Sequence, residues 1–209
     1  MFINKVRVIR PILYARKNFF STKTTSLFNY PKRMVHQRGY NIFLGDVPKY
    51  DMLHMTGYMS GWRSVDDFAY VFEKCPELTE SHISFAFLQI GQHNYDRNEN
   101  FWKIILPRVK DQLKKLDRYC PKSLSNIIQG GAVMQLQDNE FWEIVEEQLI
   151  DNRLHRYLNL DQICGLVRSL GLVGRGSDEL IEICEKYIIK HRKALTDDNI
   201  IPASQGFKE

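Results

Sequence analysis

Apolar residues recur at helical spacing in three segments of the chain, each about 40 residues after the previous one. The three sets occupy positions i, i+3, i+4 and i+7, as Ile83, Ala86, Phe87 and Ile90, then Leu124, Ile127, Ile128 and Gly131, then Ile163, Leu166, Val167 and Leu170. This spacing places each set on one face of an α-helix. A further helix is indicated at the start of this region by Val65, Phe68, Ala69 and Phe72.

Suitable helix starts precede these apolar runs. Thr79, Asn159 and Thr196 each lie four residues before an aliphatic residue, and their side-chain oxygens can accept hydrogen bonds from the free amides of a first helical turn. Cys120 occupies the equivalent place before Leu124 and is a poor cap. We expect the helices to end at the glycines that follow the apolar runs, which are Gly91, Gly130, Gly131 and those of the segment Gly171 to Gly176.

A second motif has the same period. Phe101-Trp102-Lys103-Ile104 recurs 40 residues later as Phe141-Trp142-Glu143-Ile144, and the segment from Ile181 to Cys184 keeps the apolar first and fourth positions. Recurrence at the repeat period favours packing between successive repeats for the four aromatic residues Phe101, Trp102, Phe141 and Trp142. The alternative is a platform on which nucleic-acid bases stack.

Each repeat of about 40 residues is interpreted as two antiparallel helices. One such pair cannot bury its own apolar face, whereas stacked pairs build a continuous core. The predicted fold class is therefore all-α, a short α-solenoid of about three antiparallel helix pairs over residues 64–203. An extended contact arm at residues 31–63 precedes it, and a short C-terminal tail at residues 204–209 follows. Pro107 should kink its helix or delay the start of that helix.

The repeat resembles a known type. A Phe-Trp-x-Ile motif, followed about 20 residues later by Leu124 to Ile128 and a glycine-rich turn, is similar to the helical repeats of FAST-kinase-like and octotricopeptide proteins. The resemblance covers about Ser64 to Ala203. It implies mitochondrial or plastid residence and, most often, RNA binding, although similar repeats also occur in non-catalytic subunits of enlarged respiratory complexes, ATP synthases and ribosomes. The chain differs from the RNA-binding members because it is short, its body is acidic, and no nuclease-like domain follows the repeats.

Charge is distributed unevenly along the chain. The first 45 residues contain nine Lys or Arg and no acid, whereas residues 46–209 contain 20 basic and 25 acidic residues, a net charge of −5. An acid-free, Arg-bearing and hydroxyl-containing stretch is typical of a transit peptide, so residues 1–30 are predicted to be a mitochondrial targeting segment. A basic arm for an anionic partner is the alternative. No later window has 18 consecutive apolar residues, and we expect no transmembrane segment.

Motifs for catalysis and metal binding are missing from the sequence. The six histidines have no HExxH or similar spacing, the four cysteines occur singly, and the segment Gly171 to Gly176 lacks the lysine of a phosphate-binding loop. The cysteines are interpreted as small buried apolar residues. We therefore predict no catalytic residue, no cofactor, no metal site and no enzymatic activity.

One cluster could form a face for an anionic partner. Its members are Arg108, Lys110, Lys114, Lys115 and Arg118. Lys110, Lys114 and Arg118 are expected to share one helical face, which could meet RNA, an acidic protein or lipid headgroups. A single basic stripe in an acidic body is a weak phosphate-binding signal.

Two functions are consistent with these features. The favoured one is a non-catalytic accessory subunit of a large mitochondrial assembly, a respiratory chain complex or the ATP synthase, in the matrix or on the matrix face of the inner membrane. Its partners would be other protein subunits, with possible peripheral contact with inner-membrane lipid. The alternative is an RNA-binding repeat protein in mitochondrial RNA processing, translation or the ribosome.

Overall fold

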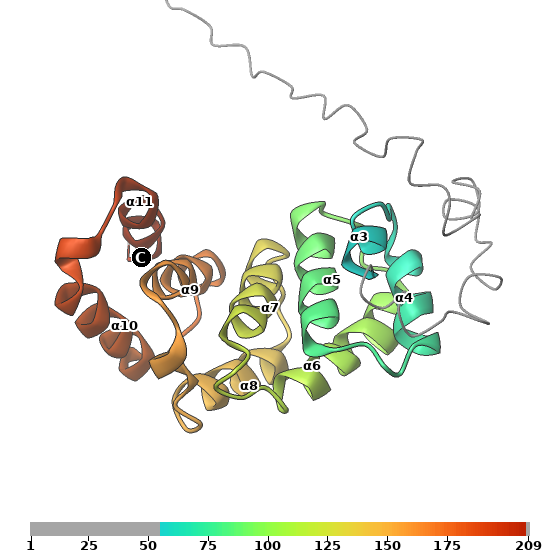
Figure 1. Ribbon diagram of the computed structural model, residues 1–209, viewed down its shortest axis with the longest axis horizontal. Coiled ribbons are helices and arrows are strands. Elements are labelled where there is room, and N and C mark those ends of the chain that lie inside the picture. The colour runs from blue at the N-terminus through green and yellow to red at the C-terminus, as the bar shows by residue number, and fades with distance from the viewer. Residues whose placement is uncertain (1–54, 208–209) are drawn as a thin grey trace, which may run out of the picture.

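A computed structural model describes residues 55–207, which are helical and contain no β-strand (Figure 1). The all-α fold class is confirmed for these residues. The α-helices are α3 (Met55–Met59), α4 (Val65–Lys74), α5 (Glu80–Gln92), α6 (Leu106–Leu113), α7 (Pro121–Val133), α8 (Asn139–Leu149), α9 (Leu160–Val173), α10 (Asp178–Lys190) and α11 (Asp197–Gly206). A π-helix, η2 (Phe101–Ile105), leads into α6, and the 3₁₀ helices are η3 (Leu154–Tyr157) and η4 (Arg192–Ala194). The expected targeting segment, residues 1–30, lies outside the described residues.

The helices from α4 onward alternate between two rows (Figure 1). In one row α5 contacts α7, α7 contacts α9, and α9 contacts α11. The other row contains α4, the continuous η2–α6 segment, α8 and α10, where η2 contacts α4 and α6 contacts α8. Helices that are neighbours within a row are therefore separated along the sequence by the repeat period.

The predicted apolar faces form the core. Every member of the four sets is buried, including Phe68, Phe87 and Ile127, each of which has no exposed surface. The ring of Phe87 links the rows, because its centroid lies 6.2 Å from that of Phe101 and 5.8 Å from that of Phe141. Two copies of the repeated Phe-Trp motif therefore meet at one side chain of α5.

The predicted helix starts are also confirmed. Thr79, Asn159 and Thr196 are the N-caps of α5, α9 and α11. In each case the side chain three residues later accepts a hydrogen bond from the backbone N–H of the cap residue, which completes the reciprocal arrangement of a capping box. Cys120 precedes α7 without a side-chain cap, and Pro121 occupies the first helical position, where its missing N–H costs nothing.

The helix ends differ from the prediction. Most of the glycines expected to end helices lie inside them, since α7 continues to Val133 beyond Gly130 and Gly131, and α9 continues to Val173 beyond Gly171. Three left-handed residues follow α5, α7 and α9 instead, namely Asn94 (φ 49°), Gln135 (φ 50°) and Gly174 (φ 61°). Only the last of these is a glycine.

Glycines inside the helices allow close contact between neighbours in the row. A Cβ atom on Gly91 would lie 2.8 Å from the carbonyl oxygen of Gly130, and one on Gly171 would lie 2.6 Å from that of Gly206. Real Cβ atoms do not approach a backbone oxygen so closely. The glycines at these positions are therefore required by helix packing, and they do not mark turns.

Pro107 lies within a continuous helical segment. The turn before it is the π-helix η2, in which the N–H of Leu106 donates to the carbonyl of Phe101, five residues earlier. Proline cannot donate a backbone hydrogen bond, and its ring collides with the carbonyl four residues before it. The wider π-turn accommodates the proline, so the expected kink or delayed start takes the form of a local change in helix type.

Helices continue past both expected boundaries of the repeat domain. Residues 31–54 of the expected arm are outside the described residues, but its last part contains α3, whose Met55 and Met59 are buried in the core. Trp62 is also buried and contacts Phe68 edge to face, with ring centroids 5.0 Å apart. At the other end, α11 continues to Gly206, past the expected domain boundary at residue 203.

Candidate functional site

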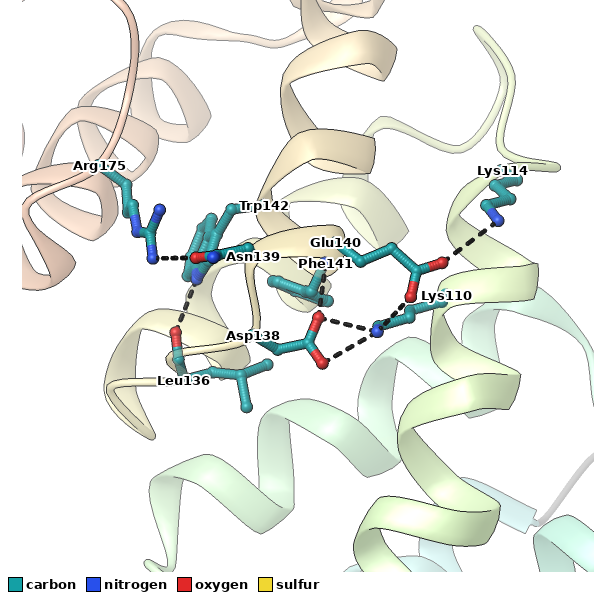
Figure 2. Close-up of polar contacts among 9 residues, drawn as sticks. All are labelled: Lys110, Lys114, Leu136, Asp138, Asn139, Glu140, Phe141, Trp142 and Arg175. Carbon is teal, nitrogen blue, oxygen red and sulfur yellow. Dashed lines mark hydrogen bonds and ion pairs between the residues drawn. The ribbon is translucent and has the colours of Figure 1, made fainter.

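Three of the four repeated aromatic residues are buried. Phe101 and Phe141 have no exposed surface, and Trp142 has 5%. The indole N–H of Trp142 donates to the carbonyl of Leu136 at 2.7 Å (Figure 2). These three residues are therefore part of the packing between helices.

Trp102 differs from this pattern, with 46% of its surface exposed. The expectation that all four aromatic residues pack between repeats does not hold for this side chain. The loops beside the two tryptophans make different contacts. Near Trp142, the loop between α9 and α10 is bound to α8 by two hydrogen bonds. Arg175 donates to Asn139 Oδ1 at 2.6 Å, and the N–H of Ser177 donates to Glu146 Oε1 at 3.0 Å.

Two shallow hollows lie at equivalent places in successive repeats. One, of about 310 Å³, is lined by Trp142 and the Gly174–Ser177 loop. The other, of about 460 Å³, is lined by Trp102, Gln135 and Gln137. Arg175 and Asn139, which are hydrogen-bonded to each other, line the first hollow. In the second hollow the indole of Trp102 is exposed to solvent. The first lies between α8 and the loop after α9, whereas the second also has residues 94–97, which precede the helix of Trp102, in its wall.

The predicted basic face is not a continuous helical stripe. α6 ends at Leu113, so Arg118 lies beyond the helix that carries Lys110. The expectation that Lys110, Lys114 and Arg118 share one helical face is therefore wrong. The physical reason is that the α-helical hydrogen bonds stop at the end of α6: the N–H groups of Lys115 and Leu116 donate to carbonyls only three residues earlier, so the chain leaves the helix.

Arg108 is bound within the chain. Its guanidinium donates to the backbone carbonyls of Phe72, of Cys75 at 2.7 Å and of Pro76 at 3.1 Å. These carbonyls lie at the C-terminal end of α4, where helix carbonyls have no partner inside the helix. Burial lowers the pKa of Arg108 from its ordinary value. The side chain therefore joins α6 to α4 and is not directed toward a partner.

Lys110 is bound in the same way to the next repeat. Its Nζ lies 2.8 Å from Asp138 Oδ1 and 2.8 Å from Glu140 Oε2, and 13% of its side chain is exposed (Figure 2). Asp138 also caps α8, since its Oδ1 accepts from the N–H of Phe141 at 2.8 Å. We call Lys110, Asp138 and Glu140 the α6–α8 clasp.

The clasp changes the acidity of two of its members. Burial on its own would lower the pKa of Lys110, but the hydrogen bonds and charges of Asp138 and Glu140 together outweigh burial and raise it. The hydrogen bond from Lys110, with its positive charge, lowers the pKa of Glu140. Both groups are therefore held in their charged forms.

The other three basic residues remain at the surface. Lys114 is 51% exposed and lies 3.8 Å from Glu140 Oε1, a weak surface pair. The guanidinium of Arg118 lies 4.8 Å from the ring centroid of Tyr119, which is 74% exposed. Lys115 is also exposed. Any anion that meets this side of the molecule meets only these three cations of the predicted five.

Sequence reasoning missed the clasp because its members are 28 and 30 residues apart. The N-cap signal could have revealed half of it, since Asp138 precedes the second Phe-Trp motif by three residues, as Asn98 precedes the first. Asn98 caps its helix in the same way, accepting from the N–H of Phe101 at 3.2 Å. The position of Lys110 opposite Asp138 follows only from the packing of the row.

The four cysteines are all free thiols. Cys75, Cys164 and Cys184 are buried and Cys120 is partly exposed. Burial, with a smaller contribution from Cys164, raises the pKa of Cys184 to about 12. Among residues 55–207 no three His, Cys, Asp or Glu side chains gather as they would around a metal ion. No helix in the same range has the length and apolarity needed to span a bilayer.

Comparison with models of known protein families gives no match, and no curated protein sequence is significantly similar to the chain.

Proposed function

We propose that the protein is a non-catalytic accessory subunit of a large mitochondrial assembly, acting through contacts with other protein subunits. The assembly is a respiratory chain complex or the ATP synthase, on the matrix side of the inner membrane. One observation carries the proposal. Arg108 and Lys110, the two cations of the basic cluster on α6, are bound to groups of this chain. The surface left for a partner carries exposed cations and acids together with exposed apolar side chains such as that of Ile201.

The fold proposed for this role is a short α-solenoid of about three antiparallel helix pairs. It is supported by the contacts within each row and by the recurrence of N-caps at Thr79, Asn159 and Thr196. Such arrays offer extended surfaces to partners, because each repeat contacts only its neighbours. The relation to FAST-kinase-like and octotricopeptide repeats belongs to the same proposal and rests on the motif spacing.

The location is supported by the acid-free, basic segment at residues 1–30. A peripheral contact with lipid is a further part of the proposal. Lys114, Lys115 and Arg118 are exposed, and the guanidinium of Arg118 lies over the exposed ring of Tyr119. Cations together with an aromatic ring suit the surface of an anionic membrane.

The alternative, RNA binding, has less support. Phosphate-dominated binding needs several free cations on one surface, and the clasp removes Lys110 from this surface. Two features favour the alternative. The motif spacing resembles that of repeats that most often bind RNA, and the exposed indole of Trp102 offers a ring on which bases can stack.

The decisive experiment is native-gel fractionation of mitochondria from the source organism, with detection of this chain. We expect the chain to comigrate with a respiratory complex or the ATP synthase. Migration only as a free small protein would overturn the proposal. Binding of RNA by residues 46–209 that weakens steeply with added salt would favour the alternative.

A further inference from the structure

The last helix exposes large apolar side chains. Ile200 is 47% exposed, Ile201 is 57% exposed, and Phe207, which directly follows α11, is 43% exposed. Ile200 and Phe207 are seven residues apart and so lie on the same side of the helix. We call these three residues the terminal face. The opposite side of α11 packs on α9, where Gly206 closely contacts Val167 and Gly171.

Comparison within the chain shows that the terminal face is open at a position that is otherwise core. Ile200 is the fourth residue after the N-cap Thr196. The fourth residues after the N-caps of α5, α7 and α9 are Ile83, Leu124 and Ile163, which are 2%, 1% and 1% exposed. Ile200 is aliphatic like the residues at this position in the other three helices, but unlike them it is exposed.

In the earlier repeats, a helix that follows in the other row contacts the equivalent helix. The ring of Phe101 in η2 stacks on Phe87 of α5. The ring of Phe141 in α8 lies directly against Gly131 of α7. α10 contacts α9. Among residues 55–207 no helix follows α11 to do the same.

We propose that the terminal face binds an amphipathic helix of another protein subunit, which occupies the place of the next helix in the row of α6, α8 and α10. This inference rests on the proposed function and specifies one of its contact surfaces. The place continues the series of contacts made by Phe101 of η2 with α5, by Phe141 of α8 with α7, and by α10 with α9. The bound helix should present large apolar residues at its first and fourth positions, as the Phe-Trp-x-Ile motif does.

Charge adds a second requirement for the partner. Asp197 and Asp198 are exposed at the start of α11, next to Ile200 and Ile201. The α6–α8 clasp shows how this fold places a lysine opposite an acid at a helix start. The partner helix should therefore carry a Lys or Arg beside its apolar stripe. A two-fold contact between copies of this chain would gather four carboxylates around one apolar centre, which like-charge repulsion disfavours.

Site-specific photocrosslinking tests this inference in the full chain. A benzoylphenylalanine replaces Ile201 in one variant and Val133, 43% exposed on α7, in the control. Crosslinked peptides are then identified by mass spectrometry from the band that contains the assembly. We expect the probe at Ile201 to crosslink to a helical segment of a different subunit that has the stated pattern. The probe at Val133 should not crosslink to this segment.

Several results would overturn the inference. They are a crosslink to a second copy of the chain, a crosslink to residues 1–54 of the same chain, and no crosslink while the chain still comigrates with the assembly. These results leave the proposed function intact, because comigration is read on the wild-type chain. If the wild-type chain does not comigrate with the assembly, both the proposed function and this inference are wrong.

A charge variant gives an independent measurement. The double substitution Ile200→Asp with Ile201→Asp should lower the fraction of chain in the assembly by about tenfold or more, since carboxylates cannot enter an apolar contact without cost. Val133→Asp is the matched control and should leave the fraction unchanged. Circular dichroism and urea unfolding should show that both variants fold, because all three side chains are exposed. Wild-type incorporation of the double variant would contradict the proposed contact.

Discussion

The Nζ atom of Lys110 on α6 lies 2.8 Å from Oδ1 of Asp138, the residue that caps α8. The two side chains are 13% and 22% exposed. An ion pair between adjacent repeats is therefore combined with a helix cap, and the carboxylate that accepts from the first turn of α8 is held in place by a lysine of the preceding repeat. The cation stabilises the contact between α6 and α8, and its ammonium group is not available to an external anion.

The first prediction concerns this clasp. Lys110→Met keeps the aliphatic part of the side chain but leaves the carboxylates of Asp138 and Glu140 without their cation. We expect the free energy of unfolding to fall by about 1–2 kcal/mol, a value reduced by the exposure of Glu140. Urea unfolding followed by circular dichroism measures the change.

The control for this variant is Lys103→Met. Lys103 pairs with Glu99 in the same helical segment, but the two side chains are 70% and 75% exposed. We expect this substitution to change stability by less than about 0.5 kcal/mol. Equal effects of the two substitutions would show that the clasp contributes no more than a surface pair.

The second prediction is the pH dependence of the clasp. The pKa of Glu140 is lowered from 4.5. Its contribution to the free energy of unfolding is therefore fully present above pH 4.5 and is lost as the pH falls through the folded value. The pKa of Lys110 is raised from 10.5. Its contribution to the free energy of unfolding is therefore fully present below pH 10.5 and is lost as the pH rises through the folded value. The stability difference between wild type and Lys110→Met should stay constant near neutral pH and shrink below pH 4.5. Urea titrations at a series of pH values test this, and a difference that grows in acid would contradict it.

The helix faces and caps could be predicted from sequence because both are local. An apolar stripe requires only the period of one helix, and Asn159 with Gln162 forms a capping box within four residues. The role of the basic cluster could not be predicted, because it depends on which acids lie opposite. Lys110 and Arg118 look alike in sequence, yet one is bound between helices and the other lies beyond the end of α6.

The third prediction concerns the glycines of α9. A Cβ atom on Gly171 would lie 2.6 Å from the carbonyl oxygen of Gly206, so Gly171→Ala must push α11 away from α9. Alanine favours a helix over glycine by about 1 kcal/mol, but the overlap with backbone outweighs this gain. We expect a net loss of about 1–3 kcal/mol, measured by thermal or urea unfolding.

Gly165 provides the matched control in the same helix. A Cβ atom there would have nothing within 4 Å, so Gly165→Ala should raise stability by about 0.5–1 kcal/mol. A stabilising Gly171→Ala would contradict the close packing of α9 and α11. In sequence the two glycines are equivalent, because the approach of a second backbone depends on tertiary packing, which no local pattern records.

The fourth prediction concerns thiol reactivity. Only the thiolate reacts with iodoacetamide, and burial raises the pKa of Cys184 to about 12. Cys120 is the one partly exposed thiol among the described residues. We expect Cys120 to be alkylated first in the native protein at pH 8 and Cys184 to react only when the protein unfolds. Mass spectrometry of labelled peptides with and without concentrated urea checks the order, and equal native rates for the two thiols would be inconsistent with the buried contact of α9 and α10.

The last prediction separates the two repeated tryptophans. Trp142→Phe removes the indole that donates to the carbonyl of Leu136, a residue with no exposed surface, and leaves both an unpaired carbonyl and a small void. Together these should cost about 2–3 kcal/mol. Trp102→Phe should change stability by less than about 0.5 kcal/mol, because the indole is 46% exposed and its neighbouring loop does not close over it. If the two substitutions have the same cost in urea unfolding, Trp102 packs as Trp142 does, and the open hollow between Trp102 and Gln135 does not exist in solution.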